Sequence, residues 1–369
     1  MSATEQVVLF SAKEVNQGLD FTTPIQKVLN SHWYVLGDEV KNFEKEFAQY
    51  VGVKHCVSVA SGSDALELAL RCLGIKSGDS VVTVANAGFY SSTAIHAIGA
   101  KPIYVDVEEN TLTLCPKALE AIIHTKPAAI VVTHLYGQLA NIEELVRIAH
   151  DAKVPILEDC AQAHGAKRNG QLAGSFGDIA CFSFYPTKNF GALGDGGAVV
   201  TNNHDLSKCL LQLRQYGWSK KYLVSISGGR NSRLDEMQAA ILRIKLPHLD
   251  ACNNQRRSIA ERYNLALANL NIKLPRCIDE SYVAHLYVIR TSKRSDLAAF
   301  LNTQKISTDI HYPVPDHQQP AYLTESKNPL SITETACETV ISLPCYPGLS
   351  DEKVLRVISA VTHFFQQES

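Results

Sequence analysis

The sequence predicts an α/β fold with a mostly parallel central sheet and a smaller α+β domain towards the C-terminus. Short apolar runs rich in Val and Ile, each bounded by Gly, Pro, Asp or Asn, are typical of buried strands. They cover residues 80–85, 102–107, 129–135, 155–158, 179–184 and 198–201. Helical patterns lie between these runs, and such alternation is typical of a parallel sheet with helices on both faces.

Two helical segments illustrate the pattern. Residues 63–73 carry apolar side chains at positions 65, 66, 69, 70 and 73, which lie on one face of a helix. Residues 142–152 follow Asn141, and Asn141 with Glu144 resembles a capping box. The first helix follows a short strand and a Gly/Ser turn, so strand and helix alternate from early in the chain.

The pattern changes after about Arg233, which indicates a second domain. A long helical stretch extends from Leu234 towards Leu270, with an interruption near Pro247. A strand, a helix, a Pro-rich loop and a final helix follow, at residues 285–291, 295–304, 311–320 and 351–367. The 369 residues suit two domains. We expect a large domain over residues 1–247, with its first residues free to pack on the other domain, and a small domain over residues 248–369.

The composition is ordinary for a globular enzyme and argues against several functions. The net charge of −2 gives no strong field for nucleic acid or an anionic membrane. No apolar stretch approaches the roughly 20 residues that span a bilayer, and the N-terminus does not resemble a secretory signal. The ten cysteines lack a C-x-x-C pair, and the thirteen histidines lack a metal-binding spacing. We therefore expect a cytoplasmic enzyme with reduced thiols and no metal.

Lys188 is the most informative residue, because it follows an apolar run and precedes a glycine-rich turn. A solvated loop lysine is the commoner use of this residue type, but the surroundings here are apolar. Burial lowers the pKa of a lysine, and a Schiff-base lysine needs a neutral amine. Asp159 ends a neighbouring strand; alone, it is equally well explained as a helix N-cap or a metal ligand. Together they fit a pyridoxal phosphate (PLP) site, where the acid keeps the ring nitrogen protonated.

A phosphate site is predicted at the turn of residues 61–63, before the first helix. Free backbone N–H groups at a helix start attract anions. Gly62 permits close approach, the Ser63 hydroxyl can donate, and Ser183 offers another hydroxyl near the lysine. A plain serine N-cap is the commoner use of such a turn, so this prediction depends on the lysine and the aspartate.

An aromatic side chain after the strand at residues 80–85 is suited to stack on the pyridine ring. Phe89 and Tyr90 are both candidates there. Packing beneath the loop explains either residue equally well, and of the two we favour Phe89 for the stacking position.

Four segments carry a resemblance to a known family. They are Ser-Gly-Ser-Asp-Ala-Leu, Glu-Asp-Cys-Ala-Gln-Ala-His-Gly, Ser-Phe-Tyr-Pro-Thr-Lys-Asn and Gly-Arg-Asn-Ser-Arg-Leu-Asp-Glu-Met-Gln-Ala-Ala, at residues 61–66, 158–165, 183–189 and 229–240. In order and spacing they resemble the DegT/DnrJ/EryC1/StrS sugar-nucleotide aminotransferases, PLP enzymes with the type I aspartate aminotransferase fold. The resemblance extends from about residue 10 to the C-terminus, and the four motifs together are specific.

The resemblance implies a role for each matching residue. Lys188 holds PLP covalently and moves the substrate proton, Asp159 pairs with the ring nitrogen, and Gln162 reaches the ring hydroxyl. Asn231 reaches the phosphate bound in the other subunit, which makes the site a property of a homodimer; a simple turn residue is the alternative. The residues implied to bind phosphate in their own chain are Ser63 and Ser183. A lysine, rather than the histidine of some dehydratases in the family, favours transamination.

The resemblance also implies the substrates. Residues 231–236 lack the aromatic-arginine pair of members that aminate C4, which favours C3 of a dTDP-linked 3-keto-6-deoxyhexose. The residues implied to bind the sugar are Tyr185, Arg233, His311 and Tyr312. L-Glutamate is the implied amino donor, and the product belongs to a surface polysaccharide such as lipopolysaccharide or to a glycosylated natural product. A C4 aminotransferase acting on a 4-keto nucleotide sugar is the alternative.

Two further alternatives come from other classes of protein. A non-catalytic regulator on the same fold would be favoured by an appended DNA-binding segment, and the sequence contains none. A lyase or decarboxylase on this fold differs in its products. Absorbance of the bound cofactor separates the first alternative from an enzyme, and product analysis with glutamate and a keto-sugar separates the second.

Overall fold

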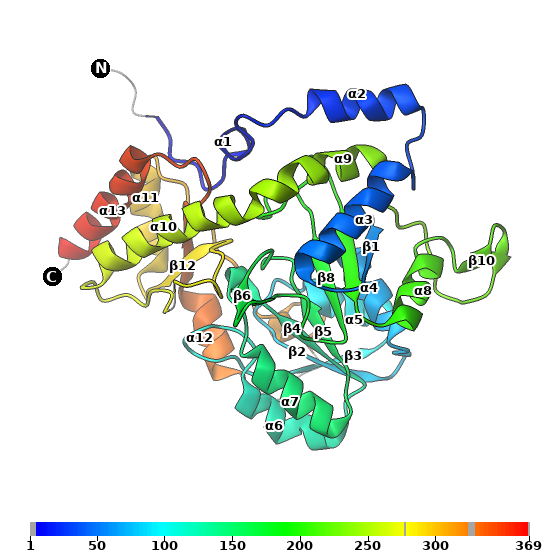
Figure 1. The fold of residues 1–369 in the computed structure, drawn as a ribbon. Coiled ribbons are helices and arrows are strands. Elements are labelled where there is room, and N and C mark those ends of the chain that lie inside the picture. The colour runs from blue at the N-terminus through cyan, green and yellow to red at the C-terminus, as the bar shows by residue number, and fades with distance from the viewer. Residues whose placement is uncertain (1–4, 277, 324–328, 368–369) are drawn as a thin grey trace.

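A seven-stranded sheet forms the centre of the molecule (Figure 1). The structure is a computed structural model, and it describes residues 5–276, 278–323 and 329–367. The strand order is β1-β9-β8-β5-β4-β2-β3. These strands are β1 (His55–Val59), β2 (Ser80–Thr83), β3 (Lys101–Tyr104), β4 (Ala129–Thr133), β5 (Ile156–Asp159), β8 (Ile179–Ser183) and β9 (Gly197–Thr201). Only β9 pairs antiparallel within this sheet, with β1 and β8, so the mostly parallel sheet predicted from the sequence is confirmed.

Helices cover both faces of the sheet. Alternate residues of each strand point to opposite sides, so each strand contributes to a core on either face. In β4, Ile130 and Val132 pack into one core, whereas Ala129 and Val131 pack into the other. One face is covered by α3 (Asp38–Val51), α6 (Pro116–Ile122), α7 (Ile142–Ala152) and α9 (Glu236–Lys245). The other face is covered by α4 (Gly62–Cys72), α5 (Tyr90–Ala97) and α8 (His204–Leu213).

A separate core lies beside the sheet, on the left in Figure 1. Its elements are α10 (Leu249–Leu267), β12 (Tyr287–Arg290), α11 (Arg294–Thr303), β13 (Val340–Leu343) and α13 (Asp351–Gln366). Val7 belongs to this core and forms a bridge with Ile306, so the N-terminal segment packs on it. A 3₁₀ turn at Leu246–His248 joins α9 to α10, at the interruption predicted near Pro247. The boundary at residue 247 stays a prediction.

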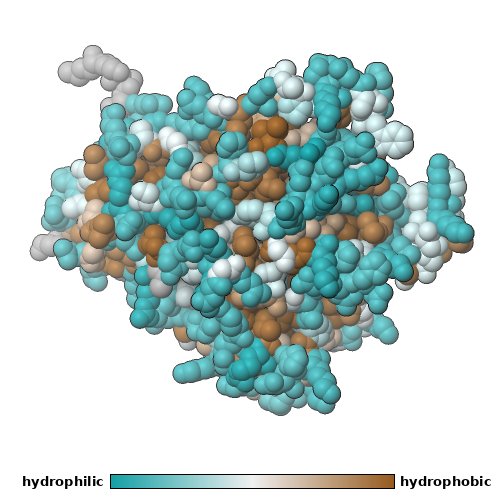
Figure 2. Space-filling view, viewed as in Figure 1, coloured by the Kyte–Doolittle hydropathy of each residue, from teal (hydrophilic) through white to brown (hydrophobic). Residues whose placement is uncertain are grey.

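The remaining elements are short or lie at the periphery. They are α1 (Ala12–Val15), α2 (Thr22–Ser31), β6 (Lys167–Arg168), β7 (Gln171–Leu172), β10 (Trp218–Lys220), β11 (Leu223–Val224) and α12 (Ser331–Thr339). The β10–β11 hairpin projects from the body at the right of Figure 1. No described helix combines the length and apolarity that crossing a bilayer requires. Hydrophilic residues dominate the face in Figure 2, with smaller hydrophobic areas between them.

The capping box predicted at Asn141 is wrong. Its side chain makes no capping hydrogen bond, and Glu144 instead pairs with Arg147 at 2.8 Å. Asn141 has ψ of 62°, outside the extended conformation that usually aims an N-cap side chain at the helix start. The nine cysteines of the described chain are free, and Cys277 lies outside the described residues.

Candidate active site

A cavity of about 490 Å³ lies at the edge of the sheet where β1, β5 and β8 end. β5 pairs in parallel with β8, and β1 has the same direction because both β1 and β8 are antiparallel to β9. Their carboxyl ends therefore share the edge at which open α/β sheets bind ligands. The predicted site residues that line this cavity are Gly62, Ser63, Asp159, Gln162, Ser183, Tyr185, Lys188, His311 and Tyr312. Three others, Phe89, Asn231 and Arg233, are not among the lining residues.

The start of α4 has backbone amides available for an anion. Ser61 is the N-cap, and its Oγ accepts a hydrogen bond from the amide of Asp64 at 3.1 Å. The amides of Gly62 and Ser63 precede the first intrahelical hydrogen bond, so they are available to a ligand. A Cβ on Gly62 would lie 2.6 Å from that of Ser183, so glycine is what lets the helix start approach β8. The arrangement suits a phosphate.

Asp159 is a buried carboxylate on the face of the sheet that α4 and α5 cover. Its Oδ1 accepts a hydrogen bond from the amide of Ala161 at 3.1 Å. Its Oδ2 accepts longer bonds from the hydroxyls of Ser91, at 3.4 Å, and Thr133, at 3.5 Å. Burial raises the pKa of Asp159, while the charge of Lys188 opposes the shift. A cation close to this carboxylate would therefore be stabilised, as the protonated nitrogen of a pyridine ring would be.

Lys188 lies on the loop after β8 and is half-buried in the same cavity. Burial lowers the pKa of its amine to about 8, against the attraction of Asp159. No carboxylate of the described chain forms an ion pair with its Nζ. Roughly a tenth of the amine is therefore neutral at pH 7, far more than for an exposed lysine. This property suits a lysine that condenses with an aldehyde.

The orientation of the Gln162 amide is fixed by a backbone group. Its Oε1 accepts a hydrogen bond from the amide of Tyr136 at 2.6 Å, so its Nε2 is left to donate. That Nε2 donates to the hydroxyl of Tyr312 at 3.1 Å. The Tyr136 hydroxyl donates to the carbonyl of His311. Tyr136 thus holds residues from both walls of the cavity, and no motif in the sequence marks it.

The structure places the two aromatic candidates, Phe89 and Tyr90, differently. The ring of Phe89 packs against Tyr322, with centroids 4.8 Å apart, and against His96. Tyr90 lines the cavity instead, and its ring is edge-on to that of Tyr312 at 6.1 Å. Phe89 has φ of 68°, in the left-handed region, so the chain reverses there and turns its side chain away from the cavity.

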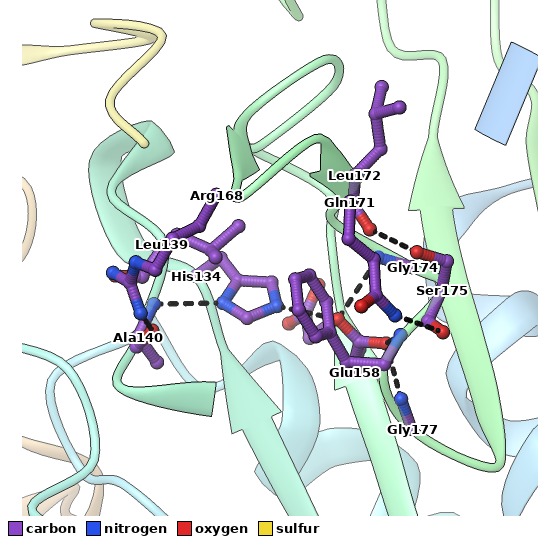
Figure 3. Close-up of polar contacts among 12 residues, drawn as sticks. His134, Leu139, Ala140, Glu158, Arg168, Gln171, Leu172, Gly174, Ser175 and Gly177 are labelled. Carbon is purple, nitrogen blue, oxygen red and sulfur yellow. Dashed lines mark hydrogen bonds and ion pairs between the residues drawn. The ribbon is translucent and has the colours of Figure 1, made fainter. Parts of the chain in front are cut away.

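A second carboxylate, Glu158, lies in a network of polar contacts with His134 and the loop at Gly174–Gly177 (Figure 3). Because successive residues of a strand point to opposite faces, it faces away from Asp159. Three backbone amides donate to it, those of Gly174, Phe176 and Gly177. The Nδ1 of His134 accepts from the amide of Ala140 at 3.1 Å, so its Nε2 carries the proton and donates to Glu158 at 3.0 Å. The ligand atoms of His134, Glu158 and Cys160 lie close enough together to hold a metal ion. However, hydrogen bonds already use the ligand atoms of the histidine and the glutamate. We assign the cluster a structural role, in which it holds the strand end in place.

Comparisons with known proteins agree with this geometry. The profile of the DegT/DnrJ/EryC1/StrS aminotransferase family matches residues 17–362. A dTDP-3-amino-3,6-dideoxy-alpha-D-galactopyranose transaminase from Aneurinibacillus thermoaerophilus is 45% identical over 360 residues, or 97% of each chain.

Solved structures of related proteins have the same fold. DesV from S. venezuelae, in complex with a ketimine intermediate, is 42% identical with a TM-score of 0.94, over 98% of this chain and 99% of that one. NtdA from Bacillus subtilis, with bound cofactor PMP, is 31% identical with a TM-score of 0.92, over 99% of this chain and 86% of that one. The chain therefore belongs to the DegT/DnrJ/EryC1/StrS aminotransferase family, as its four motifs predicted, and has the type I fold of the PLP aminotransferases.

Proposed function

We propose that the protein is a PLP-dependent aminotransferase that moves the amino group of L-glutamate to C3 of a dTDP-linked 3-keto-6-deoxyhexose. One observation carries the proposal: the buried amine of Lys188, the carboxylate of Asp159 and the anion site at α4 line a single cavity. The 3-amino sugar named for the relative from Aneurinibacillus thermoaerophilus supports the position on the sugar. A cytoplasmic location, where nucleotide sugars and glutamate are available, is part of the proposal.

The groups of the cavity fit PLP. The amides of Gly62 and Ser63 would hold its phosphate, and Asp159 its ring nitrogen. The Nε2 of Gln162 would donate to its ring oxygen, and Tyr90 would cover a ring face. When bound, PLP supplies an electron sink for the carbon that loses its proton.

Lys188 would perform the proton transfers, because its Nζ is the only lysine amine among the lining residues. In its neutral form the amine accepts the proton from the substrate carbon, and in its charged form it returns that proton. Asp159 would keep the ring nitrogen cationic throughout.

A panel of dTDP- and UDP-linked 3-keto and 4-keto sugars tests the proposal. We expect amination of dTDP-linked 3-keto sugars with glutamate as donor, measured as 2-oxoglutarate released and as the amino sugar formed. A preference for 4-keto sugars would favour the C4 alternative and refute the C3 assignment. Transfer from glutamate to the cofactor, measured without any sugar, tests the aminotransferase separately.

Tyr312→Phe and His311→Ala should impair amination of the sugar and spare the reaction with glutamate. Both residues line the cavity, and Tyr312 presents a hydroxyl held by Gln162. Losing a hydrogen bond between the site and a substrate hydroxyl is costly, so we expect the rate of sugar amination to fall roughly 10-fold or more. Single-turnover kinetics of the two half-reactions provide the measurement. If both variants lose only the glutamate half-reaction, these residues do not bind the sugar.

A homodimer with shared sites is also part of the proposal. Asn231 is exposed and lies outside its own cavity, where it forms a bridge with Gln215. The nearby β10–β11 hairpin (Figure 1) exposes Tyr222, Leu223 and Val224, and apolar groups of this kind are common at interfaces. These features support a contact in which Asn231 reaches the phosphate bound by the other subunit.

Subunit mixing tests this shared site. We expect Asn231→Ala to weaken cofactor retention, and mixed dimers with inactive Lys188→Ala subunits to recover activity. In a mixed dimer, one site combines both lesions while the other has both residues intact. No recovery, with subunit exchange verified by differently tagged chains, would show that Asn231 serves its own chain.

A further inference from the structure

Arg256 of α10 is a buried cation in the wall of the active-site cavity, and it has no acidic partner. Its side chain is 1% exposed. The Nη1 donates to three backbone carbonyls, those of Ala284, His285 and Cys345. The Nε has no hydrogen-bond partner, and the Nη2 has none among the described residues. No described aspartate or glutamate forms an ion pair with it.

This arrangement leaves a positive charge unbalanced. A buried charge is costly unless it is paired, and carbonyl dipoles offset only part of that cost. Burial lowers the pKa of Arg256, yet a guanidinium stays charged at any physiological pH. Two of its three nitrogens have no partner in the described part of the chain, and a planar two-oxygen anion matches the fork of a guanidinium.

Arg256 is connected to the segment of the reacting lysine through two residues, His285 and Asn189. Its Nη1 donates to the carbonyl of His285, and the Nδ1 of His285 lies 3.1 Å from the Oδ1 of Asn189. Asn189 directly follows Lys188 in the chain. Burial lowers the pKa of His285, and the charges of Lys188 and Arg256 lower it further, so this imidazole is neutral and lies within electrostatic range of both cations.

We propose that Arg256 binds a carboxylate of the amino donor and so selects an acidic amino acid. The inference rests on the proposed function, in which L-glutamate is the donor. A carboxylate suits the position better than a sugar-nucleotide diphosphate, because the guanidinium is almost wholly enclosed and the fork of a guanidinium matches a small planar group with two oxygens. The alternative is that Arg256 is purely structural and only links the backbone carbonyls of residues 284, 285 and 345. That role requires Nη1 alone.

Donor discrimination separates the two roles. The half-reaction that aminates the cofactor would be followed with L-glutamate, L-glutamine and L-isoglutamine, which carry two carboxylates, only the α-carboxylate and only the γ-carboxylate. We expect the wild-type holoenzyme to prefer glutamate over one of the amides, and Arg256→Gln to shrink that preference at least 10-fold. The amide whose disadvantage disappears identifies the carboxylate that is bound.

Arg257→Gln is the matched control, since Arg257 lies on the same helix, contacts Asn254 and does not line the cavity. Its donor preference should equal that of the wild type. Arg256→Lys keeps a charge and should keep part of the preference. Equal losses with all three donors, or weaker dTDP binding with an unchanged donor preference, would overturn the proposal.

A binding measurement complements the kinetics. Glutarate carries two carboxylates and no amine, so it occupies a carboxylate site without reacting. It should raise the thermal midpoint of wild-type and Arg257→Gln holoenzyme, but not that of Arg256→Gln. Equal stabilisation of all three proteins would contradict a carboxylate site at Arg256. If the wild type fails to take an amino group from glutamate at all, the proposed function itself fails.

Discussion

Lys188→Ala is expected to abolish transamination and to leave the fold intact. The amine is the only candidate among the lining residues for covalent attachment of PLP and for transfer of the substrate proton. Loss of both roles should reduce turnover to background, while removal of a buried and unpaired amine should not lower the thermal midpoint of the apoprotein. Turnover, circular dichroism and the visible absorbance of the cofactor provide the measurements.

Lys245 offers an internal control for this assignment. Burial lowers its pKa to about 8 as well, but its Nζ donates to Asn16 and Gly191, and it does not line the cavity. Borohydride reduction of the holoenzyme should therefore fix the cofactor to Lys188 and leave Lys245 unmodified. Labelling of Lys245, or retention of activity in Lys188→Ala, would contradict the assignment.

The pKa of Lys188 also predicts a pH dependence. Only the neutral amine condenses with an aldehyde, so the rate of cofactor attachment to apoprotein should rise with pH and level off above about 8. An exposed lysine would give a rise that continues to about pH 10. Stopped-flow absorbance across this range distinguishes the two, and a midpoint near 10 would mean that the amine is not desolvated.

Asp159→Asn should lower turnover by about 10²-fold or more and change stability little. An amide cannot hold a charged ring nitrogen, so the electron sink weakens. The carboxylate itself is poorly compensated in the apoprotein, since its Oδ2 accepts only bonds of 3.4 Å and 3.5 Å. Steady-state kinetics and thermal unfolding of the same preparation separate the two effects.

A cofactor analogue sharpens this test. PLP methylated on the ring nitrogen carries a permanent positive charge, so it should restore part of the turnover of Asp159→Asn. It should bring no gain to Lys188→Ala, which lacks the proton-transfer group. Near-normal activity of Asp159→Asn with ordinary PLP would show that Asp159 is structural.

Much of the fold could be predicted from the sequence, because apolar runs and their spacing mark buried strands. The predicted strand ends were less accurate. The apolar run at residues 80–85 extends two residues beyond β2, which ends at Thr83. Val84 and Ala85 are still buried, although they no longer pair with a neighbouring strand. The helix α12 and the strand β13 were not predicted, since Ser331–Thr339 is rich in Thr and Glu and Val340–Leu343 is a very short apolar run.

Candidate site residues could be chosen where a side chain's chemistry is unusual for its position, as for Lys188 and Asp159, which line one cavity in the structure. The choice between Phe89 and Tyr90 depended on a backbone angle that sequence does not encode locally. Arg256 resembled an ordinary charge on an amphipathic helix, because only the packing of distant segments encloses it. Tyr136 contributes to its neighbours partly through its backbone amide, which any residue type carries.

Tyr136 has a further consequence for how such an enzyme could be retargeted. Its amide fixes Gln162, which we propose binds the cofactor, and its hydroxyl fixes the main chain at His311, which we propose binds the sugar. The path of the loop at His311 is thereby anchored to the proposed cofactor site. New sugar preferences are then most accessible by exchanging side chains on an unaltered loop backbone, whereas insertions there would disturb the chemistry shared by every substrate.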